Sequence, residues 1–304
     1  MSAPREGTDP EIVGLIPAAG RATRLAPLPC SKELLPVGFQ SVADGADRRP
    51  KPVSQYLLER MRLGGARKVF VIARQGKWDI ADYYADGSRL GLHMAYLHVG
   101  APWGPPFTLS QATPFIGDAD VVFGFPDILV DPPDSFTPLR ARMRETGADV
   151  VLGLFNCRAD EPGDVIETDS AGRLLSLQTK EERPVRPDHY TCWMFAVWRA
   201  SFTRFLTVHC RQLAEQAQEM ARTFPGAQAP EWPVGAFIAA AARSGLHVDS
   251  VFFDSGRFLD VGTPEGITAA AGFPGVWNGL GEQAAVSLAT AHSYAPIPAD
   301  RLPG

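Results

Sequence analysis

Small residues and cations lie together directly after the first apolar segment of the chain. The segment "EIVGLIPAA" ends in Ala18 and Ala19, and Gly20, Arg24 and Lys32 follow it. Backbone N–H groups of small residues can approach an anion closely, and arginine and lysine neutralise phosphate charge. One interpretation of the stretch is a phosphate-binding loop. A tight turn with solvated cations has the same composition, and the spacing fits neither GxxxxGK[ST] nor a strict GxGxxG.

Two aspartates end later apolar runs. Asp127 closes "VVFGFPD", and Asp260 closes "GRFLD" directly before "VGTPE". A lone aspartate after a strand is often a turn former or a helix N-cap. Two of them, together with a cationic loop of small residues, indicate a magnesium site that serves a nucleoside triphosphate.

The elements that must position these residues alternate between strand and helix patterns. "EIVGLIPAA" and "RKVFVIAR" are typical of buried strands, and between them Val53, Leu57 and Met61 form the apolar stripe of a helix over 51–65. This βαβ unit predicts a parallel sheet. Ligands of open α/β sheets lie beyond the carboxyl ends of the strands, where the small-residue loop falls.

The rest of the chain continues the strand and helix patterns up to about residue 163, and then shows alternation typical of antiparallel strands. Further strands are predicted at 92–99, 119–130 and 148–156, with helices at 135–146 and 234–245, another beginning near Pro264, and a C-terminal helix followed by a Pro-rich tail. From 164 to 180, alternation around Ser-Ala-Gly indicates an antiparallel hairpin. The segments 39–52 and 224–233 are rich in turn-forming residues and predict irregular surface loops. We expect an α/β fold with a mostly parallel central sheet, helices on both faces and a smaller antiparallel part.

Composition excludes several classes of protein. The chain has 304 residues, 45% hydrophobic and 21% charged, which is typical of one large folded domain. A formal net charge of -5 argues against nucleic acid as a partner. No apolar run approaches the ~20 residues of a membrane span and no signal peptide is evident, so we expect a cytoplasmic protein without a membrane partner.

The cysteines and histidines show no catalytic or metal-binding spacing. The four cysteines, which are Cys30, Cys157, Cys192 and Cys210, form no CxxC pair, and neither HExxH nor GxSxG occurs. Hydrolase mechanisms based on zinc or on a serine elbow therefore lack their usual motifs. We expect the cysteines to be buried or idle thiols.

The motifs resemble those of the sugar-1-phosphate nucleotidyltransferases, the family of glucose-1-phosphate thymidylyltransferase and UTP–glucose-1-phosphate uridylyltransferase. "IPAAGRATRLAPLPCSKELLPVG" is similar to G-x-G-T-R-L…P-K-x-L-L-P-V, and "GRFLDVGTPEGITAA" is similar to W-x-D-x-G-T-P-E-x-x-x-x-A. "KPVSQYLLERM" resembles K-P-M-I-x-Y, and the motifs follow family order from about Ile12 to Ala271. The resemblance implies a Rossmann-like, GT-A-like fold with a catalytic domain over 1–271. Residues 272–304 would be a C-terminal segment of the same domain or a small appendage.

The resemblance also implies roles for individual residues and for Mg²⁺. Arg24, Lys32 and Asp127 are expected to be catalytic, Ala18, Ala19, Gly20, Arg24 and Gln111 to bind the nucleotide, Gly163 and Lys180 to bind the sugar phosphate, and Asp127 and Asp260 to hold Mg²⁺. A sugar-1-phosphate would attack the α-phosphate of a nucleoside triphosphate. Its oxygen is already anionic, so alignment and charge neutralisation suffice without a general base. Members of the family often assemble, so a homo-oligomer is expected.

Some positions depart from the family pattern. Ala22 stands at the second glycine of the loop, which is tolerable only if its φ is negative. Thr179 replaces the glutamate of E-K-P, Trp193 stands near a family glycine, where it would crowd a hexose or stack on it, and Val99 aligns with a base-reading glutamine. Trp103, between prolines, is either a platform for a base or part of a rigid loop. These departures leave the base and the sugar open.

Two other interpretations compete with a nucleotidyltransferase. One is a catalytically silent relative that binds a nucleotide-sugar and regulates a partner. Arg24, Lys32, Asp127 and Asp260 together argue against it, because such a relative has no need of all four. The other is a glycosyltransferase of similar architecture, against which the early loop "TRLAPLPCSKELLPV" argues.

Overall fold

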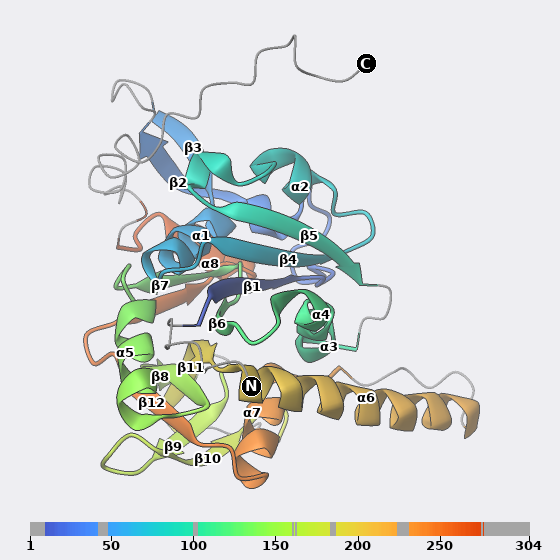
Figure 1. The fold of residues 1–304 in the computed structure, drawn as a ribbon. Helices are drawn as coiled ribbons and strands as arrows, with labels where there is room; N and C mark the ends of the chain where they lie inside the picture. The colour runs from blue at the N-terminus through green and yellow to red at the C-terminus, as the bar shows by residue number, and fades with distance from the viewer. Residues whose placement is uncertain are drawn as a thin grey trace, which may run out of the picture.

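The computed structural model describes residues 10–41, 48–99, 103–159, 161, 163–182, 187–223, 231–274 and 276. Its elements in chain order (Figure 1) are β1 Ile12–Ala18, a 3-10 turn Lys32–Leu34, β2 Pro36–Ser41, β3 Arg48–Pro52, α1 Val53–Leu63, β4 Lys68–Arg74, α2 Asp79–Tyr84, a 3-10 turn Ser88–Leu90, β5 His93–Val99, α3 Pro105–Ser110, α4 Thr113–Ile116, β6 Asp120–Gly124, β7 Ile128–Asp131, α5 Phe136–Thr146, β8 Val150–Arg158, β9 Val165–Thr168, β10 Leu174–Gln178, β11 His189–Trp198, α6 Ala200–Thr223, α7 Val234–Arg243, β12 Val248–Phe252, β13 Arg257–Asp260 and α8 Pro264–Ala270.

A nine-stranded sheet crosses the molecule. β1 lies between β4 and β6 and runs parallel to both, and β5 continues the parallel part beyond β4. β11 pairs antiparallel with β6 and leads into β8, β9 and β10, while β12 adds a parallel partner to β8. The predicted α/β class, the parallel βαβ unit and the β9–β10 hairpin are confirmed.

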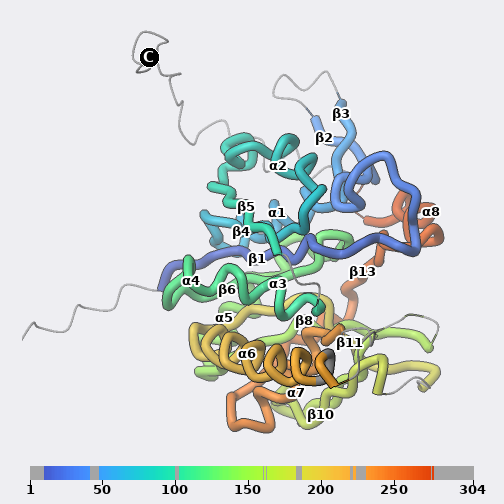
Figure 2. Tube along the Cα trace, turned by 90° about the vertical axis from the view of Figure 1, so that its right-hand side faces the viewer, coloured from blue at the N-terminus to red at the C-terminus, as the bar shows by residue number. Residues whose placement is uncertain are grey.

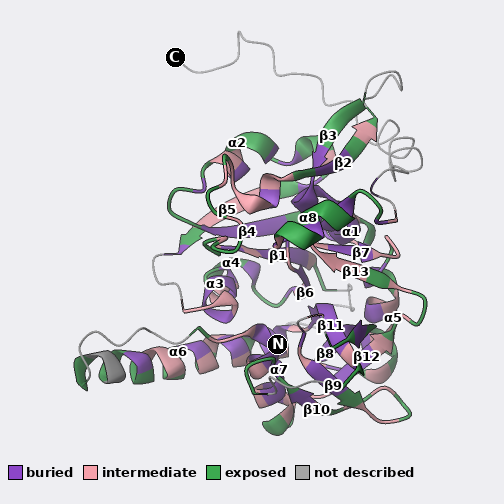
Figure 3. Cartoon of the chain, turned by 180° about the vertical axis from the view of Figure 1, so that it is seen from behind, coloured by how far each residue is buried: buried purple, intermediate pink, exposed green. Residues whose placement is uncertain are grey.

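Helices cover the sheet on both faces because alternate strand residues point to opposite sides. On β1, Val13 and Leu15 belong to a core formed with α3, α6 and α7. Ile16 and Ala18 belong to a second core formed with α1, α2 and α5. Between these cores, β1, β4, β6, β8 and β11 are mostly buried (Figure 3), whereas the edge strand β5 is largely half-buried. Among the described residues, no helix combines the length and the apolar character needed to cross a bilayer.

The longest described helix, α6, was not predicted from the sequence. Its first half packs on the sheet through Phe202, Leu206 and Cys210, which recur at helical spacing and are at most 5% exposed. Its second half carries mostly exposed polar residues and extends past the other elements (Figures 1 and 3).

Two predictions of secondary structure are wrong, one of a strand and one of a loop. The apolar run 119–130 is not one strand: β6 ends at Gly124, a turn follows, and β7 leaves the main sheet to pair with β13. The segment 39–52 is not irregular, because β2 and β3 pair as an antiparallel ribbon around residues 42–47, which lie outside the described part. Residues 224–230 of the other predicted loop, and the predicted C-terminal helix and tail apart from Val276, also lie outside it.

The expectation of four thiols is wrong for one pair. Cys157 on β8 and Cys192 on β11 form a disulfide, and their Cα atoms are 6.1 Å apart. The two strands are antiparallel neighbours, so the pairing register brings together cysteines that are distant in sequence. Cys30 and Cys210 are free thiols.

Candidate active site

The loop that follows β1 presents a run of backbone donors. The loop begins at the same end of the sheet as β13 and α8 (Figure 2). Leu25 and Ala26 donate their backbone N–H groups to the carbonyl of Ala22, at 2.9 and 3.0 Å, and so form a tight turn. Within the described part of the chain, the backbone N–H groups of residues 20–24 have no hydrogen-bond acceptor. Successive unpaired N–H groups of this kind form a concavity suited to an anion.

Ala22 adopts a backbone conformation that favours glycine. Its φ is +53°, in the left-handed region. The condition set from the sequence, a negative φ, is therefore not met. A side chain in this region costs on the order of 1 kcal/mol relative to glycine, a strain that the loop of this chain tolerates.

Two cation–carboxylate pairs meet beyond the carboxyl end of β1. The Lys32 Nζ atom lies 2.5 Å from Oδ2 of Asp127, and both side chains are largely buried. Nη1 and Nη2 of Arg24 each lie 3.3 Å from Oδ2 of Asp260 in a more exposed pair. The four charged residues singled out from the sequence thus occupy one site.

The β7–β13 ribbon brings the two aspartates together. Asp260 is the register partner of Ile128, the residue after Asp127, and Val261 donates its N–H to the Asp127 carbonyl at 2.8 Å. Gly262 donates its N–H to Oδ1 of Asp260 at 2.7 Å. The aspartates come from distant parts of the sequence, and one antiparallel ladder sets their spacing.

Gly262 marks the point on which the carboxylates converge. A Cβ atom there would lie 2.7 Å from Oδ2 of Asp127, 2.8 Å from Oδ1 of Asp260 and 3.1 Å from Nη2 of Arg24. Only glycine fits in that space. Its role was missed from the sequence, although the "DVGTPE" turn that carries it was noted.

The donor set fits Mg²⁺. This ion is usually bound by one or two carboxylates, and water and substrate phosphate complete its shell. The convergence of Asp127 and Asp260 on Gly262 supplies two such oxygens in one small space. In the described ranges no group of three or more His, Cys, Asp or Glu side chains could hold a metal, so phosphate and water would have to supply the remaining ligands.

Lys32 is held as a cation. Burial alone would lower its pKa, but the charge of Asp127 and the hydrogen bond to it outweigh burial and raise the pKa above its ordinary value. At neutral pH the side chain is therefore protonated. It can neutralise phosphate charge but cannot act as a base.

A cavity of about 430 Å³ adjoins Lys32. It is lined on one side by the loop, including Arg21 and Ala22, and on the other by Arg74 at the end of β4 and by Lys77 and Asp79 after it. Neither Arg21 nor Arg74 forms an ion pair in the part of the chain that the structure describes. The cavity therefore offers two guanidinium groups without an ion-pair partner in the described residues, beside Lys32.

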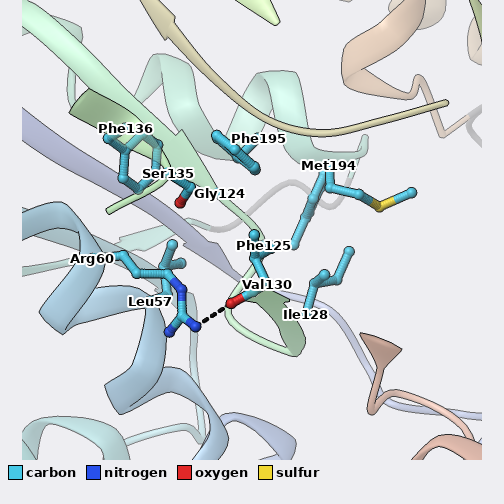
Figure 4. A pocket seen from close by; sticks show the side chains of 10 residues that line it. All are labelled: Leu57, Arg60, Gly124, Phe125, Ile128, Val130, Ser135, Phe136, Met194 and Phe195. Carbon is cyan, nitrogen blue, oxygen red and sulfur yellow. Dashed lines mark hydrogen bonds between the residues drawn. The ribbon is translucent and has the colours of Figure 1, made fainter. Parts of the chain in front are cut away.

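A second, internal cavity lies behind the turn that carries Asp127 (Figure 4). Arg60 of α1 reaches its edge, donating to the Val130 carbonyl of β7 and, at 3.0 Å, to the Tyr56 carbonyl. Burial lowers the pKa of Arg60 to about 10, so the side chain remains charged at neutral pH. Arg60 ties β7 to α1 and thereby fixes the strand that follows Asp127.

Among the other predicted ligand residues, Gln111, Gly163 and Lys180 lie apart from this cluster in the described contacts, whereas Gly20 lies beside Lys32, where a Cβ would be 3.9 Å from Nζ. The Gln111 side chain is exposed and donates to the Phe107 carbonyl of its own helix at 3.3 Å. The Lys180 ammonium is exposed and 3.8 Å from Glu181. Gly163 lies against β11, where a Cβ would be 3.0 Å from the Cβ of Cys192. Ala18 is fully buried, Ala19 half-buried and Gly20 exposed, so only their backbone is suited to ligand contact.

Asp164 was missed from the sequence. Its carboxylate accepts hydrogen bonds from Trp193 Nε1 at 2.9 Å and from the Lys180 N–H at 3.1 Å, and burial raises its pKa. Its position directly after Gly163 was the available signal. The bonds of Asp164 tie Trp193 and the backbone of Lys180 to one half-buried carboxylate next to Gly163.

The tryptophans noted in the sequence pack into the protein. Trp193 is 5% exposed and lies 6.0 Å, between ring centroids, from Phe125 in the turn before Asp127. It therefore has no free face on which a hexose could stack. Trp103 is half-buried and packs edge to face on Phe107 at 5.3 Å, which gives it a packing role.

The chain is an α/β protein whose first strand leads into a loop of unpaired backbone N–H groups, beside two converging carboxylates, an arrangement suited to a phosphate ligand. The chain belongs to the Nucleotidyl transferase family, whose model matches residues 13–274. The resemblance noted in the sequence is thereby confirmed at the level of the family.

Relatives with assigned names come from the same family. A glucose-1-phosphate thymidylyltransferase from an Actinoplanes species is 30% identical over 177 residues, which are 57% of this chain and 53% of that protein. A UTP–glucose-1-phosphate uridylyltransferase from a Synechocystis species is 27% identical over 182 residues, 55% of this chain and 43% of that protein. The matches thus span about half the length of these relatives.

The fold is also found in solved structures. UDP-glucose pyrophosphorylase complexed with UDP-glucose superposes with a TM-score of 0.64 at 17% identity, over 86% of this chain and 97% of that one. At this identity the similarity concerns the fold alone.

Proposed function

We propose that the protein is a Mg²⁺-dependent nucleotidyltransferase that joins a nucleoside triphosphate to a sugar-1-phosphate or a related phosphate acceptor. The products would be an NDP-sugar and pyrophosphate. The observation that carries the proposal is the convergence of Arg24, Lys32, Asp127 and Asp260 at the loop after β1. Family membership and the names of the relatives support it.

The residues of the site have complementary tasks. The N–H groups of residues 20–24 and the Arg24 guanidinium bind the triphosphate, and protonated Lys32 neutralises charge on the α-phosphate. Asp127 and Asp260 would hold Mg²⁺, which supplies further charge neutralisation and alignment when bound. Because the attacking oxygen is already ionised, the site needs no general base.

The reaction balances without a proton transfer. An oxygen of the acceptor phosphate forms a bond to the α-phosphorus, and the bond from that phosphorus to the bridging oxygen breaks. The electron pair leaves with pyrophosphate in line with the attack. The cavity beside Lys32, with Arg21 and Arg74, is suited to the departing phosphates because its guanidinium groups have no carboxylate partner.

Neither base nor acceptor is assigned. Val99 is 8% exposed and apolar, so it cannot read a base by hydrogen bonding. The Asp164–Trp193 contact stands where a hexose is expected in the family, which favours an unusual acceptor. A cytoplasmic location and a homo-oligomer remain predictions.

A substrate matrix tests the proposal. Common nucleoside triphosphates are combined with sugar phosphates in the presence of Mg²⁺, and release of pyrophosphate is measured. We expect at least one pair to react and Asp260→Ala to lower turnover by about a hundredfold or more. Asp118→Ala, which removes an 88% exposed aspartate paired with Arg204, is the matched control and should leave turnover unchanged.

Two results would contradict the proposal. Absence of pyrophosphate with every pair would favour a silent binding protein. Release of a nucleoside diphosphate from a nucleotide-sugar would instead identify a glycosyltransferase.

A further inference from the structure

Lys32 lies on a one-turn 3-10 segment. A buried ion pair between Glu33 of that segment and Lys77 holds it on one side. The ammonium of Lys77 lies 2.7 and 2.8 Å from the two carboxylate oxygens of Glu33, the residue after Lys32. The Lys77 and Glu33 side chains are 6% and 1% exposed. Because both oxygens are engaged, the carboxylate of Glu33 is fixed in position and orientation.

The residue before Lys32 is gripped by a second carboxylate. Asp79 accepts hydrogen bonds from the Ser31 N–H at 2.6 Å and from the Ser31 hydroxyl at 2.7 Å, one on each oxygen. Lys77 and Asp79 belong to one short segment, directly after β4. The two residues that flank Lys32 are therefore both anchored to that segment.

The anchoring segment is itself part of the rigid sheet. β4 pairs with β1 along its length, and Ala73 is the register partner of Ala18, where the phosphate-binding loop begins. A further bond, from the Ser54 hydroxyl to the Glu33 carbonyl at 2.6 Å, ties the turn to α1. The positions of the Lys32 turn and of the loop are thus both fixed relative to β1 and β4.

A buried ion pair is a weak stabilising device, because desolvation offsets the attraction between the charges. The directions of the pKa shifts agree: burial raises the pKa of Glu33 and lowers the pKa of Lys77, against the attraction of each for the other. As a positioning device the same pair is strong, since a bidentate contact leaves Glu33 little freedom. The main effect of the ion pair is therefore to fix the position of the turn that carries Lys32, and its contribution to the free energy of unfolding is small.

We infer that Lys77 and Asp79 are positioning residues that aim the Lys32 ammonium at the reacting phosphate through Glu33 and Ser31. This inference rests on the proposed function. Both residues line the cavity beside Lys32, but their side chains are engaged by Glu33 and Ser31. Their effect is transmitted by the backbone of the Lys32–Leu34 turn.

The test uses Asp79→Asn and the double variant Glu33→Leu/Lys77→Met. Asparagine keeps one acceptor for Ser31 and loses the other. The double variant replaces the ion pair with apolar groups, so that no buried charge is left unpaired. We expect each to fold with a Tm near that of the parent and to lower kcat by about tenfold to a hundredfold, with KM for the triphosphate changed by less than about threefold. Asp82→Asn, at an exposed aspartate of α2, is the matched control.

A double-mutant cycle separates positioning from general structural damage. In a Lys32→Met background, Asp79→Asn should cause no further loss of kcat, because there is no longer an ammonium to aim. An equal loss in both backgrounds, or parental kcat in a folded Glu33→Leu/Lys77→Met variant, would overturn the inference.

The position of Lys32 gives a readout that does not depend on turnover. In a crystal structure of Asp79→Asn, we expect its Nζ atom to have left the 2.5 Å contact with Asp127. An unmoved ammonium would overturn the inference even if the nucleotidyltransferase assay succeeds. If the parent protein transfers no nucleotide but the ammonium moves, the proposed function fails and the positioning contact stands.

Discussion

Replacing Gly262 with alanine is the smallest change that the site should not tolerate. The added methyl carbon would lie 2.7 Å from Oδ2 of Asp127 and 2.8 Å from Oδ1 of Asp260. Each oxygen would have to retreat by roughly 0.7 Å to reach an ordinary contact distance of about 3.4 Å. The methyl group would therefore push apart the two carboxylates that the proposed mechanism needs side by side.

The expected loss follows from the tolerance of the bound ion. Mg²⁺ requires near-ideal octahedral geometry with oxygens at about 2.0–2.1 Å, so a displacement of roughly 0.7 Å removes a ligand. Misplacement on this scale costs about a hundredfold in rate, which corresponds to about 2.7 kcal/mol of transition-state stabilisation. Gly262 has no positive φ, so alanine adds no backbone strain, and the free energy of unfolding should change by less than about 2 kcal/mol.

The assay compares Gly262→Ala with Gly272→Ala. A Cβ at Gly272 would meet only the Ala269 carbonyl, at 3.7 Å, which is an ordinary contact. Pyrophosphate release, Mg²⁺ affinity by calorimetry and Tm are measured for both. We expect activity and Mg²⁺ binding to fall only in Gly262→Ala. Full activity of this variant would refute the assignment of the two aspartates as a shared metal site.

Three further predictions concern the loop, the cavity and the thiols. Ala22→Gly should change the free energy of unfolding by less than about 1 kcal/mol and retain activity, whereas Ala22→Val, β-branched at a positive φ, should lower both Tm and pyrophosphate release. Arg74→Gln should raise KM for the triphosphate about tenfold and weaken binding of inorganic pyrophosphate, and calorimetry showing unchanged pyrophosphate affinity would count against the cavity assignment. Burial raises the pKa of Cys210 to about 12, so its thiol should resist alkylation at pH 8 and react only as the pH approaches that value, while the more exposed Cys30 is modified first, as mass spectrometry of the alkylated protein can establish.

Strand-end reasoning predicted the four charges of the site. Asp127 follows β6 at the carboxyl end of the main sheet, where ligands of α/β sheets lie. Asp260 was singled out because it ends an apolar run, but it is the pairing of β13 with β7, outside the main sheet, that brings it to Asp127. Strand-end reasoning also located Arg24 and Lys32, because both lie in the loop that leaves β1.

Features that depend on pairing register were not predictable from local pattern. The disulfide between Cys157 and Cys192 requires β8 to lie beside β11, and the grip of Lys77 on Glu33 requires the end of β4 to meet the Lys32 turn. Asp164 likewise becomes an acceptor for Trp193 only when β11 places that side chain beside it. Each of these contacts joins segments that no periodicity relates.

Other misses had a readable signal. Phe202, Leu206 and Cys210 recur at helical spacing, so the first half of α6 could have been found. The split of the 119–130 run was marked by Pro126, since proline is poorly tolerated inside a central strand. The ribbon of β2 and β3 was hidden by its prolines and charges, which are tolerated on the edge of a two-stranded sheet.

The ladder between β7 and β13 has a consequence for biosynthesis. It joins Asp127, in the first half of the chain, to Asp260, near the end of the family match. Until β13 has been synthesised, a nascent chain holds only the first of these two carboxylates. Under the proposed mechanism, metal-dependent activity would arise only after β13 has left the ribosome and paired with β7. The second aspartate would then couple catalysis to the synthesis of nearly the whole family match.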